Sequence, residues 1–329
     1  MKKTFIYSLF LGLLFVMTGC NDSYVKEQYF QKVSFKTPTS TVTRIRLKYR
    51  KDSASVYRLP LIVSGTTKTT KDIHAHVGLD IDTLAIYNQE HFYDRHDLYF
   101  QQLEDKFYDI PSTEVCIPAG KSTGLMDIHF NFKGLDLSEK WVLPLKVLDS
   151  PDYDYQSNTR KNCNNALLWI TPFNDYSGSY GVTTLSVYLD GNANPIVEDK
   201  REGYVVDENT IFFYAGAIKE NRPDRRRFKL YATFQPMDDK SGTIKLVSDN
   251  PDIQLKVAGQ PTYEIQEMAD TYKPYLIRRS LTIRDLDYTF VDPWENPNHV
   301  ANYHVKGSMT LQRNINTTIP DEEYAIEWE

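Results

Sequence analysis

The sequence lacks the short motifs that mark most catalytic sites. It contains no His-Glu-x-x-His, no Gly-x-Ser-x-Gly, no glycine-rich phosphate loop and no set of cysteines at metal-binding spacing. Beyond its N-terminal segment it has no apolar stretch long enough to span a bilayer, which takes roughly 20 residues. These absences favour a binding or structural protein over an enzyme, and they lead us to expect no metal and no cofactor.

Basic residues and cysteines are also scarce. The 329 residues include 38 Lys and Arg against 44 Asp and Glu, a formal net charge of −6. This balance argues against nucleic acid as a partner, because a phosphate backbone demands a basic surface. Only Cys116 and Cys163 lie outside the N-terminal segment. They could pair in an oxidising compartment, but a single pair without framework spacing favours two buried free thiols in strands.

The N-terminal segment is typical of an exported lipoprotein. Two lysines are followed by an apolar run from Phe5 to Val16 and by small residues before Cys20, which is the layout of a signal peptide. The Thr-Gly-Cys junction resembles a lipobox, with Met17 in the place usually held by leucine. We expect a signal peptide over residues 1–19, lipid on Cys20 and a tether over residues 20–30. The alternative is an ordinary secretory signal with a chance cysteine.

Alternation of polar and apolar residues dominates the next part of the chain. Residues 44–50, 73–79 and 126–132 alternate with a period of two, as half-buried β-strands do. This pattern predicts an all-β fold that begins with an Ig-like β-sandwich over residues 31–172. Residues 83–103 break the pattern and could hold a helix or a long excursion between strands.

A second antiparallel β domain is predicted over residues 173–329. Its strands could close into a barrel, including a lipocalin-like one, or form a second sandwich. The strand candidates are residues 183–189, 210–214, 226–234, 243–247, 253–257, 275–290, 304–313 and 324–328.

Aromatic residues, 13% of the chain, supply the candidate ligand-binding residues. Trp294 lies in a turn-rich segment whose prolines disfavour a regular strand, and Tyr153 and Tyr155 lie in another loop-like segment. Loops concentrate binding residues, and flat rings stack on sugars. The alternative for Trp294 is that it folds back and closes the end of the barrel. The tryptophans expected in the core or at strand edges are Trp141, Trp169 and Trp328.

Two clusters of titratable residues have simpler explanations than a site. His74 and His76 share one face of a strand and could begin a metal site if a third ligand came from elsewhere. The alternation places that face in water, which favours two solvated histidines. The basic run from Arg225 to Arg227 is expected to be a solvated strand start.

Several segments resemble a family of Bacteroidota surface lipoproteins. Residues 59–65, 117–121 and 142–147 resemble a β-sandwich domain of unknown function that opens many of these proteins and also precedes some glycoside hydrolases. Residues 173–180 and 307–313 resemble the all-β domain that accompanies it. The matched residues look structural, so no binding residue carries over.

The resemblance implies a non-catalytic outer-membrane lipoprotein that faces the cell exterior. It implies glycan binding as an accessory of a polysaccharide-utilisation system, beside a transporter complex of the starch-utilisation type. The competing hypothesis is a structural or adhesive surface lipoprotein with protein partners. The resemblance also implies O-glycosylation of Ser53 in Asp-Ser-Ala and of Thr83 in Asp-Thr-Leu.

Overall fold

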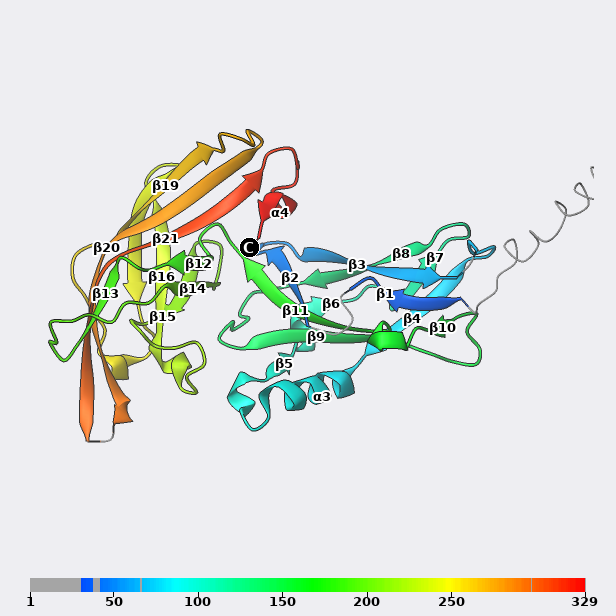
Figure 1. Ribbon diagram of the computed structural model, residues 1–329, viewed down its shortest axis with the longest axis horizontal. Helices are drawn as coiled ribbons and strands as arrows, with labels where there is room; N and C mark the ends of the chain where they lie inside the picture. Colours follow the sequence, from blue (N-terminus) through cyan, green and yellow to red (C-terminus); the bar gives the residue numbers. More distant parts are fainter. Residues whose placement is uncertain (1–30, 38–41, 66, 297, 329) are drawn as a thin grey trace, which may run out of the picture.

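The protein is built from two all-β domains placed end to end, as the sequence predicts (Figure 1). The computed structural model describes residues 31–37, 42–65, 67–296 and 298–328. The expected signal peptide, Cys20 and the tether lie outside the described residues. None of the helices within these ranges is both long and apolar enough to span a bilayer.

The first domain is a sandwich of two mixed sheets. Its strands are β1 (Lys32–Phe35), β2 (Thr43–Lys48), β3 (Ser55–Ser64), β4 (Ile73–Leu79), β5 (Phe100–Gln102), β6 (Tyr108–Asp109), β7 (Glu114–Ile117), β8 (Thr123–Phe130), β9 (Lys140–Val147), β10 (Gln156–Ser157) and β11 (Asn165–Phe173). One sheet has the order β10-β1-β3-β8-β6, and the other has the order β2-β11-β9-β4-β7 with β5 beside β9. The three segments that alternate in the sequence form β2, β4 and β8, so this prediction is confirmed.

The sandwich core lies between the two sheets. Val33, Leu59 and Ile128 of the first sheet and Leu143 and Leu168 of the second are fully buried there. Burying such side chains stabilises the fold by about 1.5–3 kcal/mol each. The alternation seen in the sequence therefore records which side of each strand faces this core.

The segment that breaks the alternation contains a helix, α3 (Ile81–Phe92), flanked by the 3-10 helices η1 (His96–Leu98) and η2 (Asp105–Phe107). The side chain of Asp80 caps α3 by accepting the backbone N–H of Thr83. Leu84 anchors the helix on the outer face of the second sheet, against Phe100 and Leu167. Of the two alternatives that the sequence left open, the helix is the correct one.

The second domain is a closed barrel. Its strands are β12 (Gly178–Gly181), β13 (Leu185–Leu189), β14 (Lys200–Val205), β15 (Thr210–Tyr214), β16 (Lys229–Pro236), β17 (Ser241–Val247), β18 (Lys256–Val257), β19 (Thr262–Ala269), β20 (Leu276–Asn296), β21 (His299–Asn316) and β22 (Ile326–Glu327). The ring runs β21-β12-β14-β15-β16-β17-β19-β20, and pairing of β20 with β21 closes it. This closure decides for the barrel over a second sandwich.

The long hairpin of β20 and β21 bends to follow the ring (Figure 1). At Gly307 the backbone φ is +138°, and a Cβ there would lie 2.1 Å from the carbonyl oxygen of Thr184. On the partner strand, a register shift between Ile283 and Leu286 surrounds Asp285, whose φ is +57°. A bulge beside a glycine with positive φ gives both strands the curvature that closure requires.

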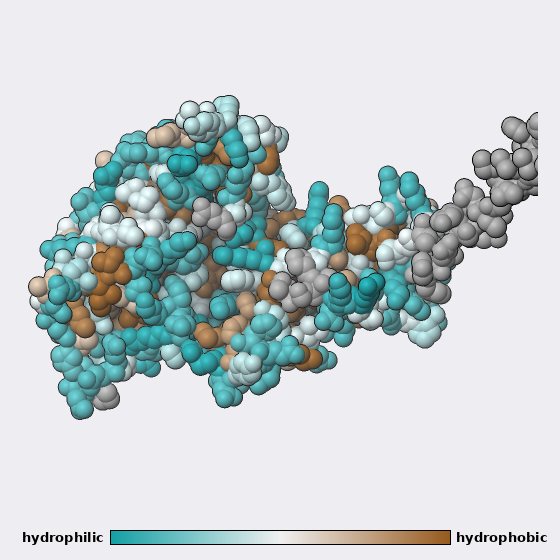
Figure 2. All heavy atoms as spheres, in the orientation of Figure 1, coloured by the Kyte–Doolittle hydropathy of each residue, from teal (hydrophilic) through white to brown (hydrophobic). Residues whose placement is uncertain are grey.

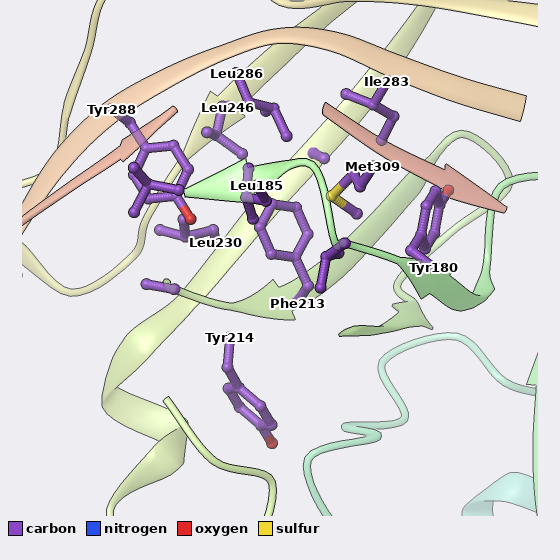
Figure 3. Close-up of a cluster of buried hydrophobic side chains, with 14 of the residues drawn as sticks. Tyr180, Leu185, Phe213, Tyr214, Leu230, Leu246, Ile283, Leu286, Tyr288 and Met309 are labelled. Carbon is purple, nitrogen blue, oxygen red and sulfur yellow. The ribbon is translucent and has the colours of Figure 1, made fainter. Parts of the chain in front are cut away.

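Side chains fill the barrel interior. Figure 3 shows Tyr180, Phe213, Leu230 and Met309 converging from four different strands, and all four are buried. Tyr214 points the opposite way, toward the sandwich domain (Figure 3), and is nevertheless 1% exposed. The barrel is therefore a packed core, and its outer wall is in part covered by the first domain.

Charged side chains fasten the two domains together. Arg225, on η4 (Arg225–Phe228), is 5% exposed and donates across the interface to the carbonyl oxygens of Ser138, at 3.1 Å, and Asp97, at 3.3 Å. Lys229 reaches both carboxylate oxygens of Asp136 at 2.7 and 2.8 Å. The expectation that residues 225–227 form a solvated strand start is therefore wrong, because the interface buries the first arginine of the run.

Candidate functional site

A cleft opens between the two domains, beside the end of β11. Figure 2 shows a largely hydrophilic surface on the barrel lobe and hydrophobic side chains where the two lobes meet. The cleft has a volume of about 270 Å³. A neighbouring hollow of about 320 Å³ shares part of its lining. We call the two together the inter-domain cleft; the residues that line both parts are Arg44, Arg46, Gly178, Glu202 and Trp328.

Two tryptophans from distant parts of the chain lie in this cleft. Trp169 projects from β11 on the side opposite the sandwich core and meets the ring of Phe100 edge to face, at a centroid distance of 5.4 Å. Trp328 follows β22, which pairs with β21 of the barrel, and its ring meets that of Phe173 at 4.9 Å. Both indoles are half-buried, so each is held by packing and still borders the cleft.

An arginine guanidinium group stacks on each indole. The Arg44 guanidinium lies 4.9 Å from the Trp169 ring centre, and the Arg46 guanidinium lies 4.7 Å from that of Trp328. Alternation along β2 places both arginines on the same side of the strand. Such cation–π pairs hold the long side chains in position, so the cleft presents fixed aromatic surfaces beside fixed hydrogen-bond donors.

Two carboxylates, partly buried Glu202 and exposed Glu220, complete the lining. Burial raises the pKa of Glu202, although the nearby Arg44 and Arg46 oppose this shift. Burial also raises the pKa of Glu220, and its carboxylate accepts a hydrogen bond of 2.8 Å from the Tyr204 hydroxyl. Perturbed acids in a concave site are typical of functional sites. Aromatic faces next to charged donors and acceptors suit a ligand with apolar faces and polar edges.

The sequence expected Trp294 on an irregular loop, and this expectation is wrong. β20 continues through Trp294 to Asn296, and Pro293 is accommodated at a register shift between Asp292 and Asn296, where a proline does not interrupt the ladder. The indole is half-buried against the barrel core, at 5.5 Å from the Phe228 ring, with the Arg227 guanidinium 4.6 Å from its centre.

This packing predicts the effect of Trp294→Ala. We expect the melting temperature to fall by several degrees, because loss of a buried aromatic costs about 3–5 kcal/mol and this one is half-buried. Glycan binding should persist, as measured with the full chain on a glycan array beside a melting curve. Loss of binding at an unchanged melting temperature would instead support the ligand contact predicted from the sequence.

The two loop tyrosines have different surroundings. Tyr155 is 2% exposed, and its hydroxyl accepts the backbone N–H of His76 at 2.8 Å and donates to the carbonyl oxygen of Leu148 at 2.9 Å. It is a core residue, which corrects the expectation of an exposed loop ring. Tyr153 is half-buried and stacks on His76 at 4.2 Å. Neither lines the inter-domain cleft, and the ligand contact predicted for Tyr153 stays a prediction.

The predicted modification residues differ in access. Ser53 is exposed, whereas Thr83 is half-buried in the first turn of α3, where its hydroxyl accepts a hydrogen bond from Asn165 at 2.9 Å. O-glycosylation at either residue stays a prediction. Cys116 and Cys163 are free thiols, but the expectation of two buried residues in strands is wrong: Cys116 is exposed on β7, and Cys163 is half-buried in the turn after η3 (Arg160–Asn162).

His74 and His76 share a carboxylate. The Nδ1 of His74 lies 2.5 Å from Glu114, and the Nε2 of His76 lies 3.8 Å from the same residue. Across the described ranges, no group of three or more histidines, cysteines or acids is arranged to hold a metal ion. The structure therefore shows two histidines beside one glutamate.

Sequence reasoning assigned both cleft tryptophans to the core or to strand edges. For Trp169 a signal was present, because Ala166, Leu168 and Ile170 form the inward set of β11 and leave Trp169 on the outer face. For Trp328 there was none. Its position depends on the pairing of β22 with β21, which only the folded chain brings about.

Comparison with solved structures places this architecture among proteins of Bacteroides. A Bacteroides ovatus protein of unknown function is 40% identical, with a TM-score of 0.81, over 90% of this chain and all of that one. A multidomain protein of the same species that includes the domain DUF1735 is 39% identical, with a TM-score of 0.80, over 92% of this chain and all of that one. The chain belongs to their family.

Further comparisons agree with this family assignment. An auxiliary nutrient binding protein from Bacteroides thetaiotaomicron is 36% identical, with a TM-score of 0.80, over 89% of this chain and 98% of its own. The domain of unknown function DUF4973 matches residues 24–151, and a C-terminal domain family matches residues 164–310. No curated protein matches the sequence. The two matched families thus fall one on each β domain.

Proposed function

We propose that this protein is a non-catalytic lipoprotein of the outer membrane that binds a glycan in the inter-domain cleft. It faces the cell exterior and serves a polysaccharide-utilisation system, as an accessory of a transporter complex of the starch-utilisation type. The observation that carries the proposal is the meeting of Trp169 and Trp328, one from each domain, in one cleft.

The chemistry of the lining supports a sugar ligand. An indole offers a broad apolar face at little conformational cost, and the apolar C–H face of a pyranose can stack on it. Arg44, Arg46 and Glu202 supply donors and acceptors at the rim for sugar hydroxyls. A family member 36% identical is described as an auxiliary nutrient binding protein, which agrees with a role in capture rather than conversion.

The test is binding of the full chain, purified in detergent, to a glycan array. Trp328→Ala should weaken binding of the selected glycan at least about ten-fold, which corresponds to about 1.4 kcal/mol. Tyr272→Ala is the control, because Tyr272 is 94% exposed and lies outside the cleft. Unchanged binding by Trp328→Ala would place the glycan elsewhere. Binding of no glycan would favour the structural or adhesive alternative.

The lipid anchor has its own test. Cys20→Ser should release the protein from the membrane fraction or block its processing, because Cys20 follows a short apolar run and a Thr-Gly pair. Fractionation of cells, followed by intact-mass analysis of the protein, measures both outcomes. A variant that stays membrane-bound and normally processed would show that the anchor lies elsewhere.

A further inference from the structure

We infer that the glycan held in the inter-domain cleft is anionic and carries carboxylate or sulfate groups. This inference rests on the proposed function and specifies its ligand. Two acidic and four basic side chains line the hollow beside Trp328. The acids there are Glu202 and Glu327; the bases are Arg44, Arg46, Arg278 and Arg313.

The net positive charge of the hollow is opposite in sign to the net charge of the whole protein. The chain carries a formal net charge of −6, so a polyanion gains nothing from the average field of the molecule. Clefts concentrate the field of their own lining charges. A basic hollow on an acidic protein therefore favours anionic ligands over neutral ones.

Arg46 has unused hydrogen-bonding capacity. In the described part of the chain its guanidinium stacks on Trp328 but donates no hydrogen bond to a protein group. Partial burial and the like charge of Arg44 both lower the pKa of Arg46. An arginine held at this cost beside another arginine offers a fork of N–H donors that matches a carboxylate or a sulfate.

Arg313 contributes a second cation from the barrel side. It is 6% exposed, and its Nη2 donates to the carbonyl oxygens of Asn174, at 2.7 Å, and Ser177, while its Nε has no partner among the described residues. Burial lowers the pKa of Arg313 to about 10. Its guanidinium lies 5.5 Å from the Trp328 ring centre. Both domains thus direct a guanidinium toward the same indole.

This arrangement suits an acidic sugar in one pose. The sugar ring packs beside Trp328, on the part of the indole that the arginines leave free, and its carboxylate or sulfate group lies against the Arg46 guanidinium, 4.7 Å from the indole centre. Charge-assisted hydrogen bonds are roughly twice as strong as neutral ones. Arg44 already lies 3.9 Å from Glu202, but a neutral sugar would leave the N–H donors of Arg46 without an anionic partner, so the acidic form should bind more tightly.

The experiment uses two matched pairs of polymers and the full chain in detergent. The pairs are polygalacturonate with its carboxyl-reduced product, and dextran sulfate with dextran. We expect one acidic polymer to bind at least about ten-fold more tightly than its neutral partner in calorimetric titration. Its affinity should fall as sodium chloride rises from about 50 to about 500 mM, because salt screens exposed charges.

Two variants separate a specific site from general attraction. Arg46→Gln should lower the affinity for the acidic polymer at least about ten-fold at an unchanged melting temperature. Arg58→Gln removes the same charge from an exposed site on β3 and should have little effect. An equal loss in both variants would mean non-specific adsorption and would overturn the inference.

The outcomes also distinguish this inference from the proposed function. Equal or tighter binding of a neutral polymer, abolished by Trp328→Ala, would overturn the anionic ligand and leave the glycan site in place. Binding of none of the four polymers would contradict the anionic ligand, and binding of no glycan on the array would contradict the proposed function as well. Preference for an acidic polymer that depends on Arg46 and Trp328 supports both.

Discussion

Replacing Asp292 by alanine is expected to lower the melting temperature of the protein by roughly 10 °C. Asp292 is fully buried. One carboxylate oxygen accepts the backbone N–H groups of Trp294, at 2.9 Å, and Glu295, at 3.2 Å, and the other pairs with Arg222. Removing it leaves two backbone donors and part of a cation without partners inside the barrel wall, at a cost of about 3 kcal/mol.

A control on the same strand separates burial from charge. Asp287 is about one-third exposed and pairs with His304 at 2.7 Å. Asp287→Ala should change the free energy of unfolding by no more than about 1 kcal/mol, because exposed ion pairs contribute little. Arg222→Met combined with Asp292→Ala should be less destabilising than the sum of the single variants. Equal effects of Asp287→Ala and Asp292→Ala in thermal unfolding would contradict the structural role of Asp292.

Replacing Arg225 by alanine is expected to uncouple the two domains. The side chain makes charged hydrogen bonds to carbonyl oxygens of the sandwich domain, at Ser138 and Asp97, and to that of Arg222 on its own side. Each such bond contributes about 1.5–3 kcal/mol at good geometry. Their loss should lower the melting temperature by several degrees and make the connection after β11 more sensitive to protease. Because the cleft is formed by docking of the domains, glycan binding should weaken as well.

Arg226 provides the matched control for this prediction. It is the next residue, it reaches Glu139 across the same interface, and about half of its side chain is exposed. Arg226→Ala should cost no more than about 1 kcal/mol, because water and salt screen the pair. Calorimetry and limited proteolysis of both variants measure the difference. An Arg226→Ala variant that separates the domains as readily as Arg225→Ala would show that buried hydrogen bonds do not hold them.

The cleft exists because of this interface. Trp169 and Arg44 belong to the sandwich. Glu202, on β14, and Trp328, after β22, belong to the barrel domain. Their separation along the chain leaves no local signal of the site. Only the docking of η4 and β16 on the sandwich places them around one space, so the sequence led instead to aromatic residues in segments with many turn formers.

The sequence by itself determined the all-β class, the sandwich and the positions of three of its strands, β2, β4 and β8. It did so because alternation is a local property, in which each residue records the side of the strand that faces a core. The same reasoning missed β12, β14 and β19. In β14 the inward positions include Arg201, which is 5% exposed, and Gly203, so the apolar alternation is absent.

Only the tertiary structure decided that the second domain is a closed barrel and that the site lies between the domains. Closure depends on pairings such as Tyr180 with Leu311 and Gly181 with Thr310, which join residues more than a hundred positions apart. The buried Arg201 is stable because its guanidinium donates to the carbonyl oxygens of Ile218, at 2.6 Å, and Gly216. Such contacts satisfy a charge inside the fold and produce no periodic pattern in the sequence. This is the physical reason that the sequence left barrel and sandwich open and did not predict the cleft.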